Sequence, residues 1–138
     1  MPKSKPFTMR LTEETDAWVE HEARRTKRSK GAVVEALAEE AARMRRFPGI
    51  AFRGPEHDRR AWLLGTALDV WQVVEAYQGM GLERMLNEGG LSEGKIRLAL
   101  AYYEAYPGEI DEAVGENRQP LEYWRRLYPG LNITERRI

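Results

Sequence analysis

Three polar residues near the N-terminus are of types that recognise bases in DNA. Thr8 and Arg10 alternate with apolar residues, and Lys5 precedes them in the same short segment. Arginine can donate two hydrogen bonds to guanine, and threonine presents both a hydroxyl and a methyl group to a base edge. We therefore predict that these three residues face the major groove. The alternatives are a solvated strand face and an edge that pairs with another protein.

A second polar cluster suits contacts with the phosphate backbone. Its residues are Arg28, Ser29, Lys30 and Gly31. Serine is a good cap for a helix, and the free N–H groups at a helix N-terminus can hold a phosphate. We predict that this cluster anchors the protein on DNA without recognising its sequence. Ordinary capping beside a solvated basic turn is the alternative.

The first cluster needs a strand to position it. Phe7, Met9 and Leu11 alternate with polar residues, which is the period of a half-buried strand and predicts one over residues 5–11. A lone strand is unstable, and no second strand lies nearby in sequence. We expect the same strand of a second chain to pair with it antiparallel, which makes the protein an obligate two-fold dimer.

Two helices are predicted after this strand. Thr12 caps the first, over residues 13–25, and Ser29 caps the second, which ends at Phe47-Pro48-Gly49. In the first helix, the residues predicted to face inward are Thr15, Trp18, Val19 and Ala23. The apolar stripe of the second helix consists of Val33, Val34, Leu37, Ala38 and Ala41.

This order of strand, threonine cap, helix, turn and helix resembles the ribbon-helix-helix family of repressors and antitoxins. The segments FTMRLTEE and RSKGAVVEAL are its most specific parts. Lys27 stands where many members of that family have glycine. The resemblance implies a dimeric DNA-binding segment over residues 1–46.

The next part of the chain, residues 47–114, has the pattern of a second small domain. Ile50 and Phe52 indicate one short strand, residues 60–64 indicate another, and the charged stretch between them predicts a hairpin loop. Helical periodicity then begins after Asp69.

Glycine and proline residues are predicted to end the helices of this domain. The helix after Asp69 is predicted to end at Gly79 and Gly81, with a short helix following. A longer helix is capped by Ser92 and is predicted to close at Pro107-Gly108. It could serve as a recognition helix or as a core helix with a solvated charged face.

Three segments of this domain resemble a family of unknown function that is often found in antitoxins. They are PGI-x-FRG at 48–54, LGTALDVWQVVEAYQGMG at 64–81 and LSEGKIRLALAYYEAYPGEID at 91–111. The resemblance implies a homeodomain-like helix-turn-helix fold with a small hairpin, and a PIN-like ribonuclease toxin as partner. The hairpin tip here is acidic, whereas the family has a basic-glycine tip.

The remaining residues, 115–138, form a tail rich in aromatic residues and arginine. We predict a partner-binding segment, because aromatic anchors and guanidinium groups suit a carboxylate-rich site. The residues assigned to this role are Trp124, Arg125, Arg126 and Tyr128. Docking of the aromatic residues back onto the second domain is the alternative.

Composition narrows the other possibilities. The chain has no cysteine, and its two histidines, His21 and His57, are far apart, so no metal site is expected. Residues 1–46 contain 11 basic and 8 acidic residues, whereas residues 47–138 contain 11 and 14. No cofactor or catalytic residue is predicted, and the absence of a leader pattern favours the cytoplasm.

We therefore predict a mainly α protein: a dimeric β-α-α ribbon-helix-helix segment, then a small helical helix-turn-helix-like domain with a short β-hairpin. The predicted function is that of a DNA-binding transcriptional repressor, the antitoxin of a toxin–antitoxin pair, rather than an enzyme. Its expected partners are operator DNA, a second copy of the chain and a PIN-like toxin. A stand-alone transcription factor and a homodimeric protein-interaction scaffold that does not bind DNA are the alternatives.

Overall fold

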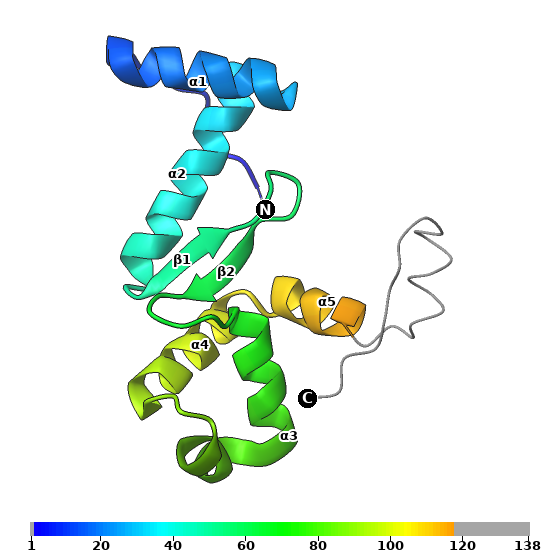
Figure 1. Cartoon of the computed structure of the whole chain (residues 1–138). Coiled ribbons are helices and arrows are strands. Elements are labelled where there is room, and N and C mark those ends of the chain that lie inside the picture. Colours follow the sequence, from blue (N-terminus) through cyan, green and yellow to red (C-terminus); the bar gives the residue numbers. More distant parts are fainter. Residues whose placement is uncertain (1, 118–138) are drawn as a thin grey trace. The chain divides into compact units, whose positions relative to one another are not determined.

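The computed structural model describes residues 2–117, which fold into five helices and one two-stranded antiparallel sheet (Figure 1). The protein is mainly helical, as predicted. The chain divides into two compact units between Arg46 and Phe47, where the sequence analysis also placed a boundary. We refer to them as the N-terminal unit and the C-terminal unit.

The N-terminal unit consists of two helices whose starts are set by side-chain caps. Helix α1 (Glu13–Thr26) begins after Thr12, whose hydroxyl accepts a hydrogen bond of 3.3 Å from the backbone N–H three residues later. Helix α2 (Lys30–Arg46) begins after Ser29, whose hydroxyl accepts an equivalent bond of 3.1 Å. Both predicted caps and both predicted helices are confirmed.

The turn between these helices contains a strained residue. Lys27 ends α1 in the left-handed conformation, with φ 55° and ψ 41°, and its N–H donates to carbonyls of the last turn of α1. It is the one non-glycine residue with positive φ in the described chain. Left-handed backbone favours glycine, so the lysine stands at a site that glycine occupies at lower cost.

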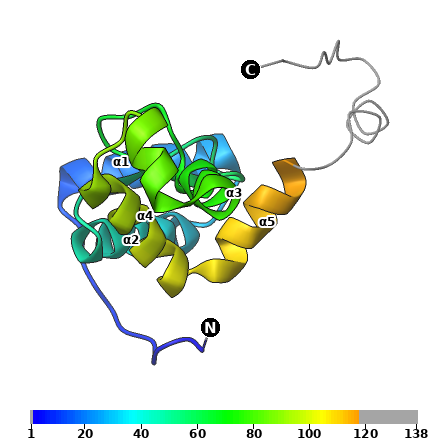
Figure 2. The ribbon, with the colours of Figure 1, turned by 90° about the horizontal axis from the view of Figure 1, so that it is seen from below.

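The predicted strand over residues 5–11 is wrong for the single chain. Residues 2–12 form neither helix nor strand, and the first regular element is α1 (Figure 2). A strand exists only where its N–H and C=O groups meet those of a neighbouring strand. The two strands in the described chain pair with each other, and neither pairs with this segment.

The N-terminal unit buries little apolar surface. Val19 and Val33 are its two buried hydrophobic residues within 2–46. Thr15 and Trp18, predicted to face inward, are both exposed, and the apolar stripe of α2 is largely exposed beyond Val33. Two short helices alone provide too little surface to cover one another's apolar faces.

The C-terminal unit begins with the predicted hairpin. Strands β1 (Ile50–Arg53) and β2 (Arg60–Leu63) are antiparallel, with Ile50 opposite Leu63 and Arg53 opposite Arg60. Ile50 and Leu63 are each only 1% exposed, so this pair of the ladder faces the helices that follow.

Three helices complete the unit. Helix α3 (Val70–Glu88) is interrupted at Gly81, where φ is 78° and ψ is 168°, so the predicted break and the short helical segment after it are confirmed. Helix α4 (Glu93–Ala105) begins after Ser92, whose hydroxyl accepts a hydrogen bond from the backbone N–H of Lys95, as predicted.

The sequence analysis missed the last described helix, α5 (Pro107–Asn117). Pro107 was interpreted as a stop, but proline is also favoured at the first position of a helix, where its missing N–H is not needed. The predicted domain end at residue 114 falls inside α5, whose Val114 is buried in the core.

The core of the C-terminal unit joins the hairpin to all three helices. Tyr102 of α4 is completely buried, and its ring lies 5.5 Å from that of Phe47 and 4.9 Å from that of Tyr106, measured between centroids. Ile96 and Ala99 are also fully buried. Aromatic residues of α4 therefore serve as core packing. Within residues 2–117, no helix is long and apolar enough to span a membrane.

Candidate nucleic-acid interface

The residues predicted to contact bases lie on the extended segment before α1. Lys5, Thr8 and Arg10 are all exposed, and Arg10 forms no hydrogen bond or ion pair within residues 2–117. The apolar residues between them are exposed as well, with Phe7 at 77% and Met9 at 54%. Both faces of this segment are therefore available for contacts outside the single chain.

A groove of about 1000 Å³ lies between this segment and the first half of α2. Its apolar wall is formed by Phe7, Met9, Leu11, Val34 and Ala38. The groove therefore adds to the apolar surface that the single chain leaves open to solvent in a unit with two buried hydrophobic residues within 2–46.

The turn before α2 holds Arg28 in place. Its Nε donates a hydrogen bond of 3.0 Å to the Thr26 hydroxyl, which in turn donates one of 2.7 Å to the backbone carbonyl of Glu22. Arg28 is half-buried, so its guanidinium is partly used for holding the turn together.

The N-terminus of α2 has open backbone donors. Ser29 caps the N–H of Ala32, whereas the N–H groups of Lys30 and Gly31 donate no hydrogen bond to any part of the described chain. A β-carbon built on Gly31 would meet nothing within 4 Å. An anion can therefore approach these two N–H groups closely, and the helix dipole favours it.

Lys30 itself is already paired. Its ammonium forms an ion pair with the Asp16 carboxylate, and Glu20 Oε1 lies 3.9 Å away. The hydrogen bond to Asp16 raises the pKa of Lys30 above its ordinary value. The sequence analysis missed both acidic partners, because they lie on α1 and meet Lys30 only through the packing of α1 against α2.

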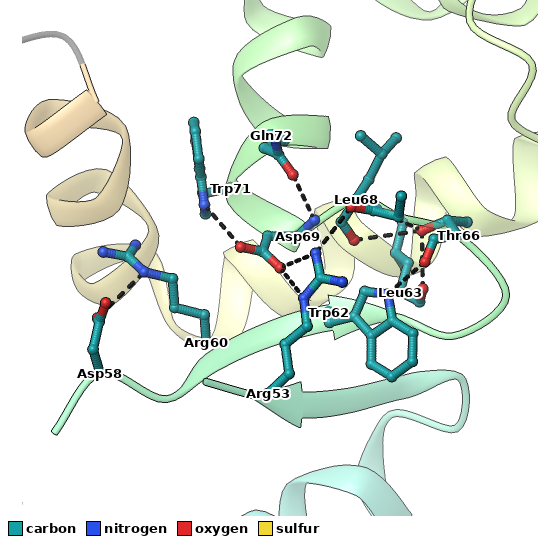
Figure 3. Close-up of polar contacts among 11 residues, drawn as sticks. Arg53, Asp58, Arg60, Trp62, Leu63, Thr66, Leu68, Asp69, Trp71 and Gln72 are labelled. Carbon is teal, nitrogen blue, oxygen red and sulfur yellow. Dashed lines mark hydrogen bonds and ion pairs between the residues drawn. The ribbon is translucent and has the colours of Figure 1, made fainter. Parts of the chain in front are cut away.

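The arginines of the hairpin are bound within the C-terminal unit, and Figure 3 shows two of them, Arg53 and Arg60. Arg53 donates to Asp69 at 2.9 Å and lies over the ring of Trp62, and Arg59 donates to the carbonyls of residues 52 and 54. Arg60 pairs with Glu116 of α5 at 2.8 Å. Arg53 and Arg60 thus hold the hairpin against the start of α3 and against α5, whereas Arg59 braces the hairpin itself.

Helix α4, for which a recognition role and a core role were both left open, presents little free positive charge. Arg97 pairs with Glu93 at 2.8 Å, one turn away, and Lys95 is half-buried. In the preceding segment Arg84 pairs with Glu88 at 2.9 Å. Residues 47–117 contain six basic and twelve acidic residues, so this part of the unit has a net negative charge that disfavours contact with phosphates.

Two carboxylates of α5 accept hydrogen bonds from tyrosines of α4. Tyr102 donates to Glu109 at 2.8 Å and Tyr103 donates to Asp111 at 2.7 Å. The hydrogen bond to Asp111 raises the pKa of the Tyr103 hydroxyl. These contacts give both carboxylates a structural role in joining α4 to α5.

The residues predicted to bind a partner protein, Trp124, Arg125, Arg126 and Tyr128, lie outside the described residues. Comparisons of the chain with models of protein families, with curated proteins and with solved structures found no match.

Proposed function

We propose that this protein is a DNA-binding transcriptional repressor that acts as a homodimer through residues 5–46. The observation that supports this most directly is the exposed apolar surface of the N-terminal unit. Phe7 and Met9 are exposed beside an open groove, while the unit buries two hydrophobic residues of its own within 2–46. A second copy that covers this surface would remove from water apolar side chains that the single chain leaves exposed.

In the proposed dimer, residues 5–11 of the two chains pair as an antiparallel ribbon. The alternation of side chains directs Phe7, Met9 and Leu11 towards the helices, and directs Thr8 and Arg10 to the opposite face. A two-stranded ribbon fits the major groove, where Arg10 can bind guanine. Backbone phosphates would bind at the open N–H groups of Lys30 and Gly31.

The more specific proposal is that the protein is an antitoxin that neutralises a PIN-like ribonuclease and represses its own operon. It rests on the resemblance of residues 48–111 to antitoxin-associated domains. The acidic balance of residues 47–117, with all five arginines bound internally, also suits a unit that contacts protein rather than DNA. The expected contacts with the toxin include Trp124, Arg125, Arg126 and Tyr128.

A gel-shift titration tests the repressor proposal. Purified protein is titrated against the DNA upstream of its own gene and against a duplex of shuffled sequence, at several salt concentrations. We expect preferential binding to the upstream DNA that weakens steeply with salt. Loss of all binding at low salt would leave the scaffold alternative, a homodimer that contacts only proteins.

Truncation after Asn117 tests the antitoxin proposal. The truncated protein is expected to bind DNA as the full chain does, but to fail to inhibit the nuclease encoded beside it. If no neighbouring gene product co-purifies with the full chain, a stand-alone transcription factor is the better description. If the truncation unfolds residues 47–114, the tail belongs to the core of the C-terminal unit.

A further inference from the structure

Lys30 lies at the proposed phosphate site but faces two carboxylates of its own chain. Its ammonium is paired with Asp16, and Glu20 Oε1 is 3.9 Å away. Asp16 and Glu20 are four residues apart on α1, so they lie on one face of that helix, towards the start of α2. No other side chain of residues 2–117 forms an ion pair with Lys30.

This arrangement disfavours an ion pair between Lys30 and a phosphate bound at the N-terminus of α2. A phosphate that approached α2 would meet a lysine whose charge is already compensated, with a second carboxylate beside it. Breaking the Lys30–Asp16 pair to make a Lys30–phosphate pair exchanges one ion pair for another, with little net gain. The backbone N–H groups of Lys30 and Gly31 have no such competitor.

We infer that Asp16 and Glu20 limit the affinity of this protein for DNA by withholding Lys30 from the phosphate backbone. This inference rests on the proposed DNA-binding function and deepens it. The inference differs from the prediction made from the sequence for Lys30. If the lysine anchored DNA, wild-type binding would depend on it. A withheld lysine becomes important only after its carboxylate partners are removed.

The test measures binding to a random-sequence duplex of about 30 base pairs over about 50 to 200 mM salt. Wild type, K30A, D16N/E20Q and the triple variant D16N/E20Q/K30A are compared. We expect K30A to weaken wild-type binding much less than it weakens the binding of D16N/E20Q, because the lysine side chain is withheld only while its carboxylate partners are present. D16N/E20Q should bind about 3- to 10-fold more tightly and steepen the salt dependence by about 0.9 in log–log slope, equivalent to one added phosphate contact.

The triple variant separates Lys30 from a general charge effect. Adding K30A to D16N/E20Q should abolish both the gain in affinity and the change in slope. The matched control is E13Q/E14Q, which removes the same two charges from the first turn of α1 without touching Lys30. An equal gain in E13Q/E14Q, at an unchanged slope, would be a net-charge effect and would overturn the inference.

Failure of this inference has a different signature from failure of the repressor proposal. If wild type binds DNA and K30A alone weakens it as strongly as K30A does in the D16N/E20Q background, Lys30 is not withheld. The repressor proposal then stands and the inference is wrong. If neither wild type nor D16N/E20Q binds the duplex at the lowest salt, the repressor proposal is wrong and the inference falls with it. Circular dichroism of each variant establishes that it is folded.

Discussion

The two units of this protein differ in how far each completes its own core. Of the sixteen buried hydrophobic residues in the described chain, fourteen lie in residues 47–117 and two in residues 2–46. The C-terminal unit packs a hairpin and three helices around Tyr102 and Ile96. The N-terminal unit has two helices, an unpaired apolar segment and an open groove. The C-terminal unit therefore has a core of its own, whereas the N-terminal unit leaves most of its apolar surface exposed, which the proposed dimer would cover.

The units also differ in the use of their charged residues. Every arginine of residues 47–117 binds a carboxylate or a carbonyl within its own unit. In the N-terminal unit, by contrast, Arg10 makes no such contact within the described residues. Arginines already bound within a fold are less available to phosphate, so this difference is consistent with the proposed placement of DNA binding in the N-terminal unit.

The largest expected effect comes from making the N-terminal segment polar. In the variant F7E/M9E we expect the dimer to dissociate at micromolar concentration, with loss of the helical signal of residues 13–46. Burying each such side chain is worth about 1.5–3 kcal/mol, and a dimer would bury two from each chain. Sedimentation equilibrium and circular dichroism measure both effects.

A matched substitution in the C-terminal unit sharpens this prediction. Leu86 is 40% exposed, close to the exposure of Met9, but it belongs to a unit with its own core. L86E should leave the oligomeric state unchanged. If the dimer tolerates F7E/M9E but is lost in L86E, the interface lies in the C-terminal unit, and the proposed dimer through residues 5–46 is wrong.

A cavity in the C-terminal unit should have the next largest effect. Ile96 is fully buried among the hairpin and helices, so Ile96→Ala should lower the free energy of unfolding by about 2–5 kcal/mol. Urea titration followed by tryptophan fluorescence measures this loss.

The unfolding of this unit should not depend on protein concentration, whereas that of the N-terminal unit should. Comparison of melting temperatures over a hundredfold range of concentration provides the control. Concentration dependence in both transitions would show that the C-terminal unit also needs a partner.

Local signals in the sequence were sufficient for most of the fold. Thr12, Ser29 and Ser92 cap the helices that they were predicted to cap, since capping depends on residues within one turn. Gly81 breaks α3 because its backbone is left-handed there. Pro107 was misinterpreted because proline both stops helices and starts them, and the buried Val114 that favours the second choice is a tertiary feature.

The candidate interface could be predicted only in part. The types of residue in the Arg28-to-Gly31 turn and the cap at Ser29 follow from the sequence. The pairing of Lys30 with Asp16 does not, because it depends on how α1 packs against α2. The strand predicted over residues 5–11 is absent, because alternation of apolar and polar residues does not specify a pairing partner and no strand of the described chain pairs with this segment.

Substitution of one arginine in each unit tests the proposed difference in DNA binding between the N-terminal and C-terminal units. Arg10→Ala should reduce discrimination between the upstream DNA and a shuffled duplex by about 1–3 kcal/mol, because a bidentate contact to guanine is lost. Arg97→Ala, in α4, should leave discrimination unchanged, since Arg97 is bound to Glu93. Competition gel shifts measure both ratios. A larger loss of discrimination in Arg97→Ala would place base recognition on α4 instead.

The smallest expected effect concerns the backbone of the N-terminal unit, at the turn between α1 and α2. Lys27 is left-handed, with φ 55°, and a residue with a β-carbon is disfavoured there by about 1–2 kcal/mol. Glycine removes that cost. It also has more conformational freedom in the unfolded chain, and the loss of this entropy on folding offsets about 0.5–1 kcal/mol of the gain. Lys27→Gly should therefore raise the free energy of unfolding by about 0.5–1 kcal/mol, measured by urea titration at fixed protein concentration. Lys27→Ala removes the same charge but keeps the β-carbon, so it should give no gain. Equal stabilisation by both variants would mean that the lysine charge, rather than the left-handed backbone, limits the stability of this turn.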